Sequence, residues 1–302
     1  MCSKTSVVPS SSTSEPKEAM TTYLVTGAAG MLGQDLQKAL TGRDVTSLGR
    51  ADLDVTDLDA VRAAVAGHDV VINASAYTRV DDAESHEADA LAVNATGAQN
   101  LAIAASENRA KLVQVSTDYV FDGSATSPYD EATPLNPISA YGRTKAEGER
   151  LAQAANPDGT YIVRTAWLYG AGGPNFVATM LRLAASHDTV SVVTDQLGQP
   201  TWTADLARQI IELLDADVAP GVYHATNSGQ ASKFDFTREI FRVVGLDPNR
   251  VKPTTSGEFV SPAPRPDYSV LGHDAWARTG ISPMRSWKAA LSAAHSAGVL
   301  MI

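Results

Sequence analysis

Cysteine is almost absent from this chain of 302 residues, and Cys2 is the only one. A disulfide within the chain and a cysteine-rich metal site are therefore both excluded. The six histidines are scattered along the sequence and form no HExxH-type pair. The sequence thus predicts no metal centre built from cysteine or histidine.

Long hydrophobic runs and positive charge are also scarce. No apolar run approaches the ~18 residues that a membrane-spanning helix needs, and the N-terminus lacks the apolar segment of a secretory signal. The formal net charge of -10 argues against nucleic acid or an anionic membrane as a partner. We therefore expect a cytoplasmic protein that has no nucleic-acid or membrane partner.

Large apolar side chains are nearly missing from residues 1–20, which are rich in Ser, Thr and Pro. A segment of this composition buries too little surface to offset the entropy lost on ordering. We expect residues 1–20 to be a disordered leader, or to be left out altogether if translation starts at Met20.

Apolar segments alternate with segments of helical periodicity from Thr22 to about Tyr169. This alternation predicts an α/β fold with a doubly wound parallel sheet, the Rossmann arrangement. The expected strands are 23–26, 44–48, 69–73, 111–116 and 161–164. The expected helices are 32–40, 58–66, 87–107 and 139–155.

The pattern loosens after Tyr169, where Pro and Gly become frequent. We expect a dinucleotide-binding domain over residues 21–169 and a smaller C-terminal substrate-binding lobe over residues 170–302. Two apolar segments in that lobe, 190–193 and 221–226, could return to the main sheet as strands.

A glycine-rich turn follows the first expected strand, with the spacing Gly27-x-x-Gly30-x-x-Gly33. Such a turn allows the backbone to approach a pyrophosphate closely, and the start of the next helix, at Met31 and Leu32, offers free N–H groups. The alternative is a glycine-rich turn that binds nothing. With a strand before it and an amphipathic helix after it, the turn predicts a dinucleotide site.

The end of the second strand indicates which dinucleotide is preferred. Many NAD sites have an acidic residue there, but this chain reads Ser47-Leu-Gly-Arg50. Arg50 would suit a 2′-phosphate, so we expect NADPH to be preferred and NADH to be tolerated, unless Arg50 is an ordinary solvated residue. Asp54 and Val55 are expected beside the adenine.

Tyr141 and Lys145 are four residues apart in an expected helix and therefore share one face. Tyrosine has an ordinary pKa near 10, and a nearby ammonium is expected to lower that pKa. Thr117 follows an apolar strand, at the end where ligands of open α/β sheets bind. Together these residues predict a nicotinamide site with its own proton donor, although an exposed Tyr/Lys pair on a helix is common.

Four residues at the end of the third strand are expected to line the cofactor: Asn73, Ala74, Ser75 and Ala76. Asn94, on the long helix, either anchors a water near Lys145 or caps a local backbone group.

Segments between about residue 22 and residue 205 resemble the extended short-chain dehydrogenase/reductase superfamily and, within it, the dTDP-4-dehydrorhamnose reductase family. The segments that carry the resemblance are Val25–Gly30, Asn73–Thr78, Val80–Asp81, Ser116–Gly123, Pro137–Tyr141 with Lys145, Arg164–Trp167 and Asp195–Pro200.

The resemblance implies that NAD(P)H reduces the C4 carbonyl of dTDP-4-dehydro-L-rhamnose, in the last step of dTDP-rhamnose biosynthesis. It implies that the catalytic residues are Thr117, Tyr141 and Lys145. The implied substrate contacts are Thr117, Asp118, Tyr119, Phe121, Tyr141 and Trp167. The Trp167 indole would be an apolar platform for the deoxysugar.

Some members of the family are dimers bridged by Mg²⁺ through carboxylates near the first helix and after a Gln-Pro segment. Asp35 and Asp205 occupy comparable places here, which leaves a bridging Mg²⁺ open, although no other feature of the sequence predicts a metal. The resemblance implies a monomer or a homodimer.

Three alternatives share the expected fold. A sugar-nucleotide dehydratase typically has Thr-Asp-Glu where this chain has Thr117-Asp118-Tyr119. A 4-epimerase usually has Ser-Ser/Thr-Ala-x-Val-Tyr-Gly in this place, unlike Ser-Thr-Asp-Tyr-Val-Phe here. A non-catalytic relative, such as the regulatory subunit of methionine adenosyltransferase, stays open because it could keep the cofactor site without turnover.

Overall fold

The computed structural model describes residues 20–259 and 261–300. The leader predicted over residues 1–20 therefore lies outside the described residues, apart from Met20. No helix within the described ranges combines the length and the apolar character needed to cross a membrane.

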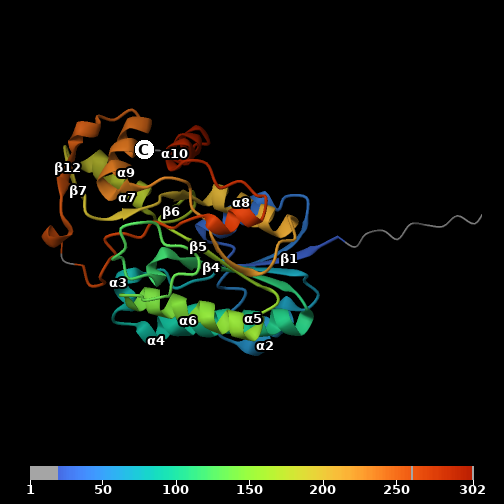
Figure 1. The fold of residues 1–302 in the computed structure, drawn as a ribbon. Coiled ribbons are helices and arrows are strands. Elements are labelled where there is room, and N and C mark those ends of the chain that lie inside the picture. Colours follow the sequence, from blue (N-terminus) through green and yellow to red (C-terminus); the bar gives the residue numbers. More distant parts are fainter. Residues whose placement is uncertain (1–19, 260, 301–302) are drawn as a thin grey trace, which may run out of the picture.

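A six-stranded sheet with the order β10-β5-β4-β3-β1-β2 forms the centre of the molecule, and every neighbouring pair is parallel (Figure 1). The predicted doubly wound sheet is confirmed. The strand order reverses between β1 and β3, and ligands bind at such a switch point in open α/β sheets. The strands are β1 (Thr22–Thr26), β2 (Asp44–Leu48), β3 (Val70–Asn73), β4 (Lys111–Thr117), β5 (Thr160–Thr165) and β10 (Gly221–His224).

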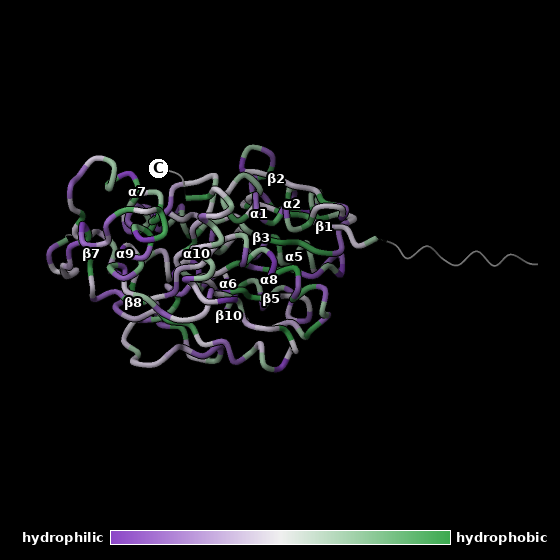
Figure 2. The backbone as a smooth tube through the Cα atoms, turned by 90° about the horizontal axis from the view of Figure 1, so that it is seen from above, coloured by the Kyte–Doolittle hydropathy of each residue, from purple (hydrophilic) through white to green (hydrophobic). Residues whose placement is uncertain are grey.

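How deeply each strand is buried follows from its position in the sheet. Every residue of β3 and β5 is buried, because helices cover both faces of the sheet there. The edge strand β2 has no buried residue. Figure 2 shows the hydrophobic residues gathered along the inner strands, with hydrophilic residues in the surrounding loops.

Two helical layers cover the sheet. Helices α1 (Met31–Ala39) and α8 (Thr203–Asp215) pack on the face that presents Val25, Ile72 and Val163. The opposite face presents Leu24, Val71 and Leu112, and its layer lies below the sheet in Figure 1. That layer consists of α2 (Leu58–Val65), α5 (Gly97–Asn108) and α6 (Ala140–Ala155).

The helix predicted over residues 87–107 is present but is not regular. The short helices α3 (Val80–Ala83) and α4 (Glu87–Leu91) precede a π-helical turn over Ala92–Thr96, which continues directly into α5. Gly148 of α6 lies against this turn, and a Cβ there would be 2.1 Å from the Asn94 carbonyl oxygen. The close approach of α6 therefore depends on a glycine.

A second hydrophobic core holds the C-terminal lobe together around Phe236, Phe241 and Trp287. Its helices are α7 (Phe176–Ser186), α9 (Lys233–Val243) and α10 (Trp287–Ser296). Its short strand pairs are β6 (Leu168–Tyr169) with β9 (Thr201–Trp202), β7 (Val190–Val193) with β12 (Val251–Thr254), and β8 (Leu197–Gly198) with β11 (Ala231–Ser232).

Only one of the two segments considered for return to the main sheet does so. Strand β10, within 221–226, pairs with β5. Segment 190–193 forms β7 and pairs with β12 in the lobe, because its alternating buried and partly or fully exposed residues suit a sheet with one covered face.

Candidate active site

The glycine turn lies at the switch point between β1 and β3. Gly27 has a φ of 69°, and a Cβ there would be 2.6 Å from the carbonyl carbon of Ala74. A Cβ on Gly33 would be 2.3 Å from the Gly27 carbonyl oxygen. Both glycines are therefore required by backbone approach, and the turn brings β1, β3 and α1 together.

The first turn of α1 follows Gly30, which provides no side-chain cap, and contains no acidic residue. Its backbone N–H groups and the positive end of its dipole are thus left available to an anion. Of the two predicted contacts, Met31 is partly exposed, whereas the Leu32 side chain is buried in the core. Leu32 can therefore offer only its backbone.

The residues after β2 form a short polar loop. Arg50 is exposed, and hydrogen bonds from Thr56, together with the charge of Arg50, lower the pKa of the Asp54 carboxyl. Val55 is buried and packs against Gly97, where a Cβ would lie 2.6 Å from a Val55 methyl carbon. An acidic residue that the sequence analysis did not select, Asp52, accepts a 2.9 Å hydrogen bond from the Gly49 N–H.

The end of β3 is fixed by hydrogen bonds within the chain. The Asn73 side chain donates to Gln114 at 2.7 Å and accepts from the Thr26 hydroxyl and the Ser75 N–H. Asn73 is therefore an organiser of this edge, with its own polar atoms already used. The following residues Ala74, Ser75 and Ala76 are partly exposed.

Asn94 lies in the π-helical turn and is 2% exposed. Its side chain accepts from the Tyr77 N–H at 2.8 Å and donates to the Tyr77 carbonyl and to the Thr144 hydroxyl. The structure thus supports the second of the two roles considered for Asn94, the capping of backbone groups. This bonding ties the segment after β3 to α6.

Thr117 ends β4, and Tyr141 and Lys145 lie in the first turns of α6, whose N-cap is Ser139. Helix α6 approaches the Thr117 segment closely, because a Cβ on Gly142 would be 2.2 Å from the Tyr119 carbonyl oxygen. The Tyr119 and Tyr141 rings meet edge to face at 5.7 Å between centroids.

The pKa values of Tyr141 and Lys145 differ from the expectation that the lysine lowers the pKa of the tyrosine. Burial raises the pKa of Tyr141 to about 12, and only the hydrogen bond with Thr117 opposes it. Burial lowers the pKa of Lys145 to about 8, with the Glu149 charge opposing. Because burial dominates, the expected lowering of the Tyr141 pKa is not found, and the Lys145 ammonium donates instead to the Val115 carbonyl at 2.6 Å.

A buried ion pair behind Lys145 was missed from the sequence. Glu149 lies one turn further along α6 and pairs with Arg164 of β5 at 2.8 Å, with side chains 2% and 4% exposed. Arg164 also approaches His224, and burial, followed by the Arg164 charge, lowers the pKa of His224 to about 3. The signal was available, since Glu149 follows Lys145 at helical spacing and a buried-strand arginine needs a partner.

The predicted substrate contacts differ in how far their side chains are exposed. Asp118 is 2% exposed, and burial raises its pKa to about 6. Tyr119 is partly exposed. Phe121 is 1% exposed and stacks on Tyr129 at 4.3 Å, so it is a core residue here without a free face.

Trp167 has a left-handed backbone with a φ of 44° and a partly exposed side chain. A Cβ on Gly198 would be 2.5 Å from its indole ring, so the ring packs directly on backbone. Non-glycine residues held in this region of φ concentrate at functional sites.

Two cationic side chains of the C-terminal lobe, Lys233 and Arg265, also contact residues of this region. The Lys233 ammonium lies 3.3 Å from the centroid of the Trp167 ring. Arg265 pairs with Asp81 at 2.8 Å. Neither was selected from the sequence, because no local pattern links them to partners that lie far earlier in the chain.

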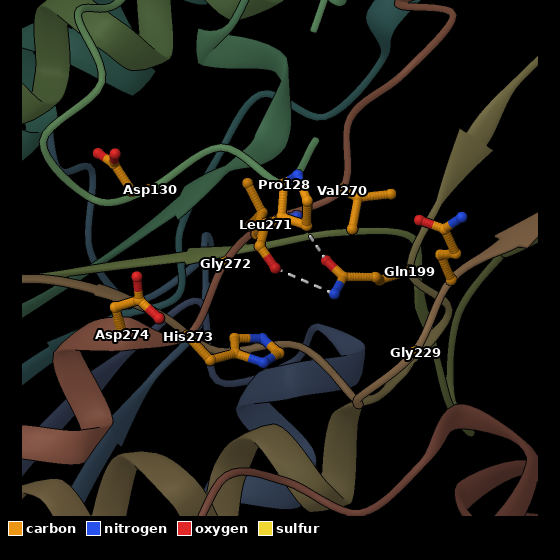
Figure 3. A pocket seen from close by; sticks show the side chains of 10 residues that line it. Pro128, Asp130, Gln199, Gly229, Val270, Leu271, Gly272, His273 and Asp274 are labelled. Atoms are coloured by element: carbon orange, nitrogen blue, oxygen red, sulfur yellow. Dashed lines mark hydrogen bonds between the residues drawn. The ribbon is translucent and has the colours of Figure 1, made fainter. Parts of the chain in front are cut away.

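A cavity of about 500 Å³ lies at the seam between the loop before α6 and the C-terminal segment (Figure 3). The amide of Gln199 spans part of it, donating to the Leu271 carbonyl and accepting from the Leu271 N–H. Within the described chain, none of the predicted site residues lines this cavity.

The carboxylates considered for Mg²⁺ are used inside the chain. Asp35 accepts from the Lys38 ammonium and the Thr203 hydroxyl. Asp205 accepts from Arg285 and Asn227. Across residues 20–259 and 261–300, no group of three or more potential metal-binding side chains occurs, so the structure gives the metal no support.

Comparisons with known proteins agree with this geometry. The family model described as RmlD substrate binding domain matches residues 20–298. The chain is 54% identical over 278 residues to dTDP-4-dehydrorhamnose reductase of Streptomyces griseus, covering 89% of this chain and 91% of that protein. It is 49% identical over 276 residues to dTDP-4-keto-6-deoxy-D-glucose reductase of Streptomyces niveus, covering 90% and 96%.

A crystal structure of dTDP-4-dehydrorhamnose reductase from Bacillus anthracis in complex with NADP superposes with a TM-score of 0.89 at 38% identity, covering 92% of this chain and 100% of that one. The resemblance predicted from the sequence is thereby confirmed. The chain belongs to the RmlD substrate binding domain family, together with these dTDP-4-dehydrorhamnose reductases.

Proposed function

We propose that this protein reduces the C4 carbonyl of dTDP-4-dehydro-L-rhamnose to give dTDP-L-rhamnose. The observation that carries the proposal is that Tyr141 and Lys145 of α6 both bond to the end of β4, Tyr141 to Thr117 and Lys145 to the Val115 carbonyl. The relatives named above give the substrate class.

Tyr141 is the proposed general acid. Because burial raises its pKa to about 12, the phenol stays protonated at neutral pH, which is the form that can donate to the C4 oxygen. The Thr117 hydroxyl is proposed to hydrogen-bond the same oxygen. General acid catalysis of this kind is typically worth about 10²–10⁴-fold.

NADPH is the proposed cofactor, and it supplies a hydride when bound. The residues present fit a dinucleotide, since the turn has no space for Cβ atoms at Gly27 and Gly33, and α1 begins without a side-chain cap. Arg50 is exposed and free to hold a 2′-phosphate, and the Lys145 ammonium is the proposed donor to the ribose hydroxyls. NADH is expected to be tolerated.

A second candidate differs only in the sugar. Relatives of nearly equal identity are named for other dTDP-4-keto-6-deoxysugars, including the Streptomyces niveus protein at 49%. Asp118, Tyr119 and Trp167 are the proposed substrate contacts, and their chemistry suits any 6-deoxysugar. We therefore keep reduction of dTDP-4-keto-6-deoxy-D-glucose as the alternative.

The test is oxidation of NADPH with each of the two keto sugars, generated in situ and offered in parallel. We expect turnover to be faster with dTDP-4-dehydro-L-rhamnose, and NMR of the product should give the rhamno configuration at C4. Faster turnover with dTDP-4-keto-6-deoxy-D-glucose would make that sugar the proposed substrate and dTDP-4-dehydro-L-rhamnose the alternative. Absence of turnover with both would favour the non-catalytic alternative.

A cytoplasmic location and a monomeric or homodimeric state stay predictions, whereas a Mg²⁺ bridge through Asp35 and Asp205 was only left open by the sequence. The last can be checked by adding EDTA to the same assay. Loss of activity that Mg²⁺ restores would support the bridge.

A further inference from the structure

Lys233, the first residue of α9, has no hydrogen bond or ion pair from its side chain within residues 20–259 and 261–300. Its ammonium lies 3.3 Å from the Trp167 ring centroid and 4.6 Å from that of Phe176. Burial lowers its pKa to about 7, the Asp118 charge opposes this, and the Arg265 charge adds to it. Lys233 is partly exposed, and its ammonium contacts aromatic rings where no carboxylate of the described chain pairs with it, so this environment favours an anionic ligand.

The other cation nearby is already engaged. Arg265 donates to both carboxylate oxygens of Asp81, at 3.0 and 2.8 Å. Hydrogen bonding to Asp81 raises the pKa of Arg265, as expected for a charge held by its partner. Lys233 is therefore the uncommitted positive charge of this region.

Asp118 is a second polar group that lacks full pairing. Its Oδ1 accepts from the Thr117 hydroxyl at 2.9 Å, whereas its buried Oδ2 has no partner among the described residues. Asp118 and Lys233 are close enough for each to influence the other's pKa, yet they form no ion pair. A ligand with an anionic group and a hydroxyl group would satisfy both.

The place of these groups relates them to the proposed chemistry. Thr117 and Thr165 are register partners on β4 and β5, and Trp167 follows two residues after Thr165. Asp118 follows Thr117 directly. The Lys233 ammonium, on the face of Trp167, therefore lies next to the end of β4 where the carbonyl would react.

We propose that Lys233 binds the diphosphate of the nucleotide-sugar substrate and that its ammonium leaves the Trp167 ring when it does so. This inference rests on the proposed function for the identity of the ligand. A lysine suits the task, because its long flexible stem can carry a point charge from the ring to a phosphate. The uncovered indole then becomes available to the apolar side of the deoxysugar.

The experiment measures binding of dTDP and of thymidine by calorimetry, with the full-length wild type and two methionine variants. Lys233→Met removes the proposed contact. Lys288→Met is the matched control, because Lys288 also lies over a tryptophan ring, that of Trp287, at 5.4 Å, but is exposed. NADPH affinity, measured in parallel, reports whether each variant keeps its fold.

Lys233→Met should weaken dTDP about 10- to 100-fold, the range for losing hydrogen bonds to a charged group. Thymidine and NADPH affinities should stay unchanged, Lys288→Met should match the wild type, and Lys233→Arg should restore most of the dTDP affinity. Equal dTDP affinity in wild type and Lys233→Met, or equal weakening of dTDP and thymidine, would overturn the inference. Because dTDP binding needs no turnover, a wild type that binds dTDP without reducing the sugar would refute the proposed function alone.

Discussion

The cofactor side and the substrate side of the site differ in how their buried polar groups are satisfied. On the cofactor side, Asn73, Asn94 and Lys145 all form hydrogen bonds within the chain. On the substrate side, Asp118 Oδ2 has no partner among the described residues, and the Lys233 ammonium contacts aromatic rings instead of an anion.

The difference indicates how each side becomes complete. On the cofactor side, the chain itself satisfies the side chains that position the end of β3 and α6, so changes to them should affect the fold as well as binding. The substrate side leaves its hydrogen-bonding capacity to a ligand, since an unpaired buried polar group is costly until it is paired. Each prediction below tests that contrast.

Tyr141 lies between the cofactor side and the substrate side, and its replacement should have the largest effect, on turnover. Tyr141→Phe removes the proposed proton donor and keeps the ring that meets Tyr119 edge to face. Turnover should fall about 10²–10⁴-fold, the usual worth of a general acid. NADPH affinity, measured by fluorescence titration, should be unchanged, and a variant that kept near-normal turnover would remove Tyr141 from the mechanism.

The buried ion pair behind Lys145 should give the next largest effect, on stability. Glu149→Gln leaves the Arg164 guanidinium buried without its counter-charge, which should lower the free energy of unfolding by about 3–5 kcal/mol. Glu147→Gln on the same helix breaks only an exposed pair with Arg150 and should cost less than ~1 kcal/mol. If urea denaturation gave the same loss in free energy of unfolding for both variants, the Glu149–Arg164 pair would not be what stabilises the cofactor side.

Cofactor choice should depend on Arg50. Arg50→Ala should weaken NADPH by about 1.5–3 kcal/mol, the range for hydrogen bonds to charged groups, and leave NADH nearly unaffected. Arg182→Ala is a suitable control, because Arg182 is an exposed arginine of α7. A wild type that favours NADH would mean that Arg50 points into solvent.

The pH dependence of stability should show the smallest effect when it is measured per pH unit. Burial lowers the pKa of Lys145 from 10.5 to about 8, so between these values the unfolded chain binds more protons at this residue than the folded chain. The free energy of unfolding should therefore rise with pH in this window, by at most ~1.4 kcal/mol per pH unit. Lys145→Met should reduce that rise, and an unchanged slope would place the ammonium in solvent.

The sequence was sufficient for the sheet and for placing Tyr141 and Lys145 on one face of a helix. Fully buried strands such as β3 and β5 are continuous apolar runs, and Tyr141 and Lys145 share a helix, so local spacing was enough to relate them. The place of Thr117 after an apolar strand was also readable from the sequence, whereas the resemblance added Trp167, which follows the neighbouring strand β5.

The remaining features depend on contacts between distant segments. The π-helical turn around Asn94 follows from the approach of Gly148, which no local pattern indicates. Phe121 looked like a ligand contact, but its stacking on Tyr129 could be seen only in the folded chain. Lys233 reaches Trp167 from a separate helix, so its role could not be predicted from spacing.

The return of β10 to the main sheet has a consequence for biosynthesis. Helix α8 and Trp276 pack in the same core as β1 and β5, and the Trp276 indole donates to the His224 carbonyl at the end of β10. A nascent chain that has emerged only as far as residue 169 would expose the part of this sheet face that α8 and Trp276 cover. Cotranslational folding must therefore wait for the last part of the chain, and during that time the uncovered face is a target for chaperones.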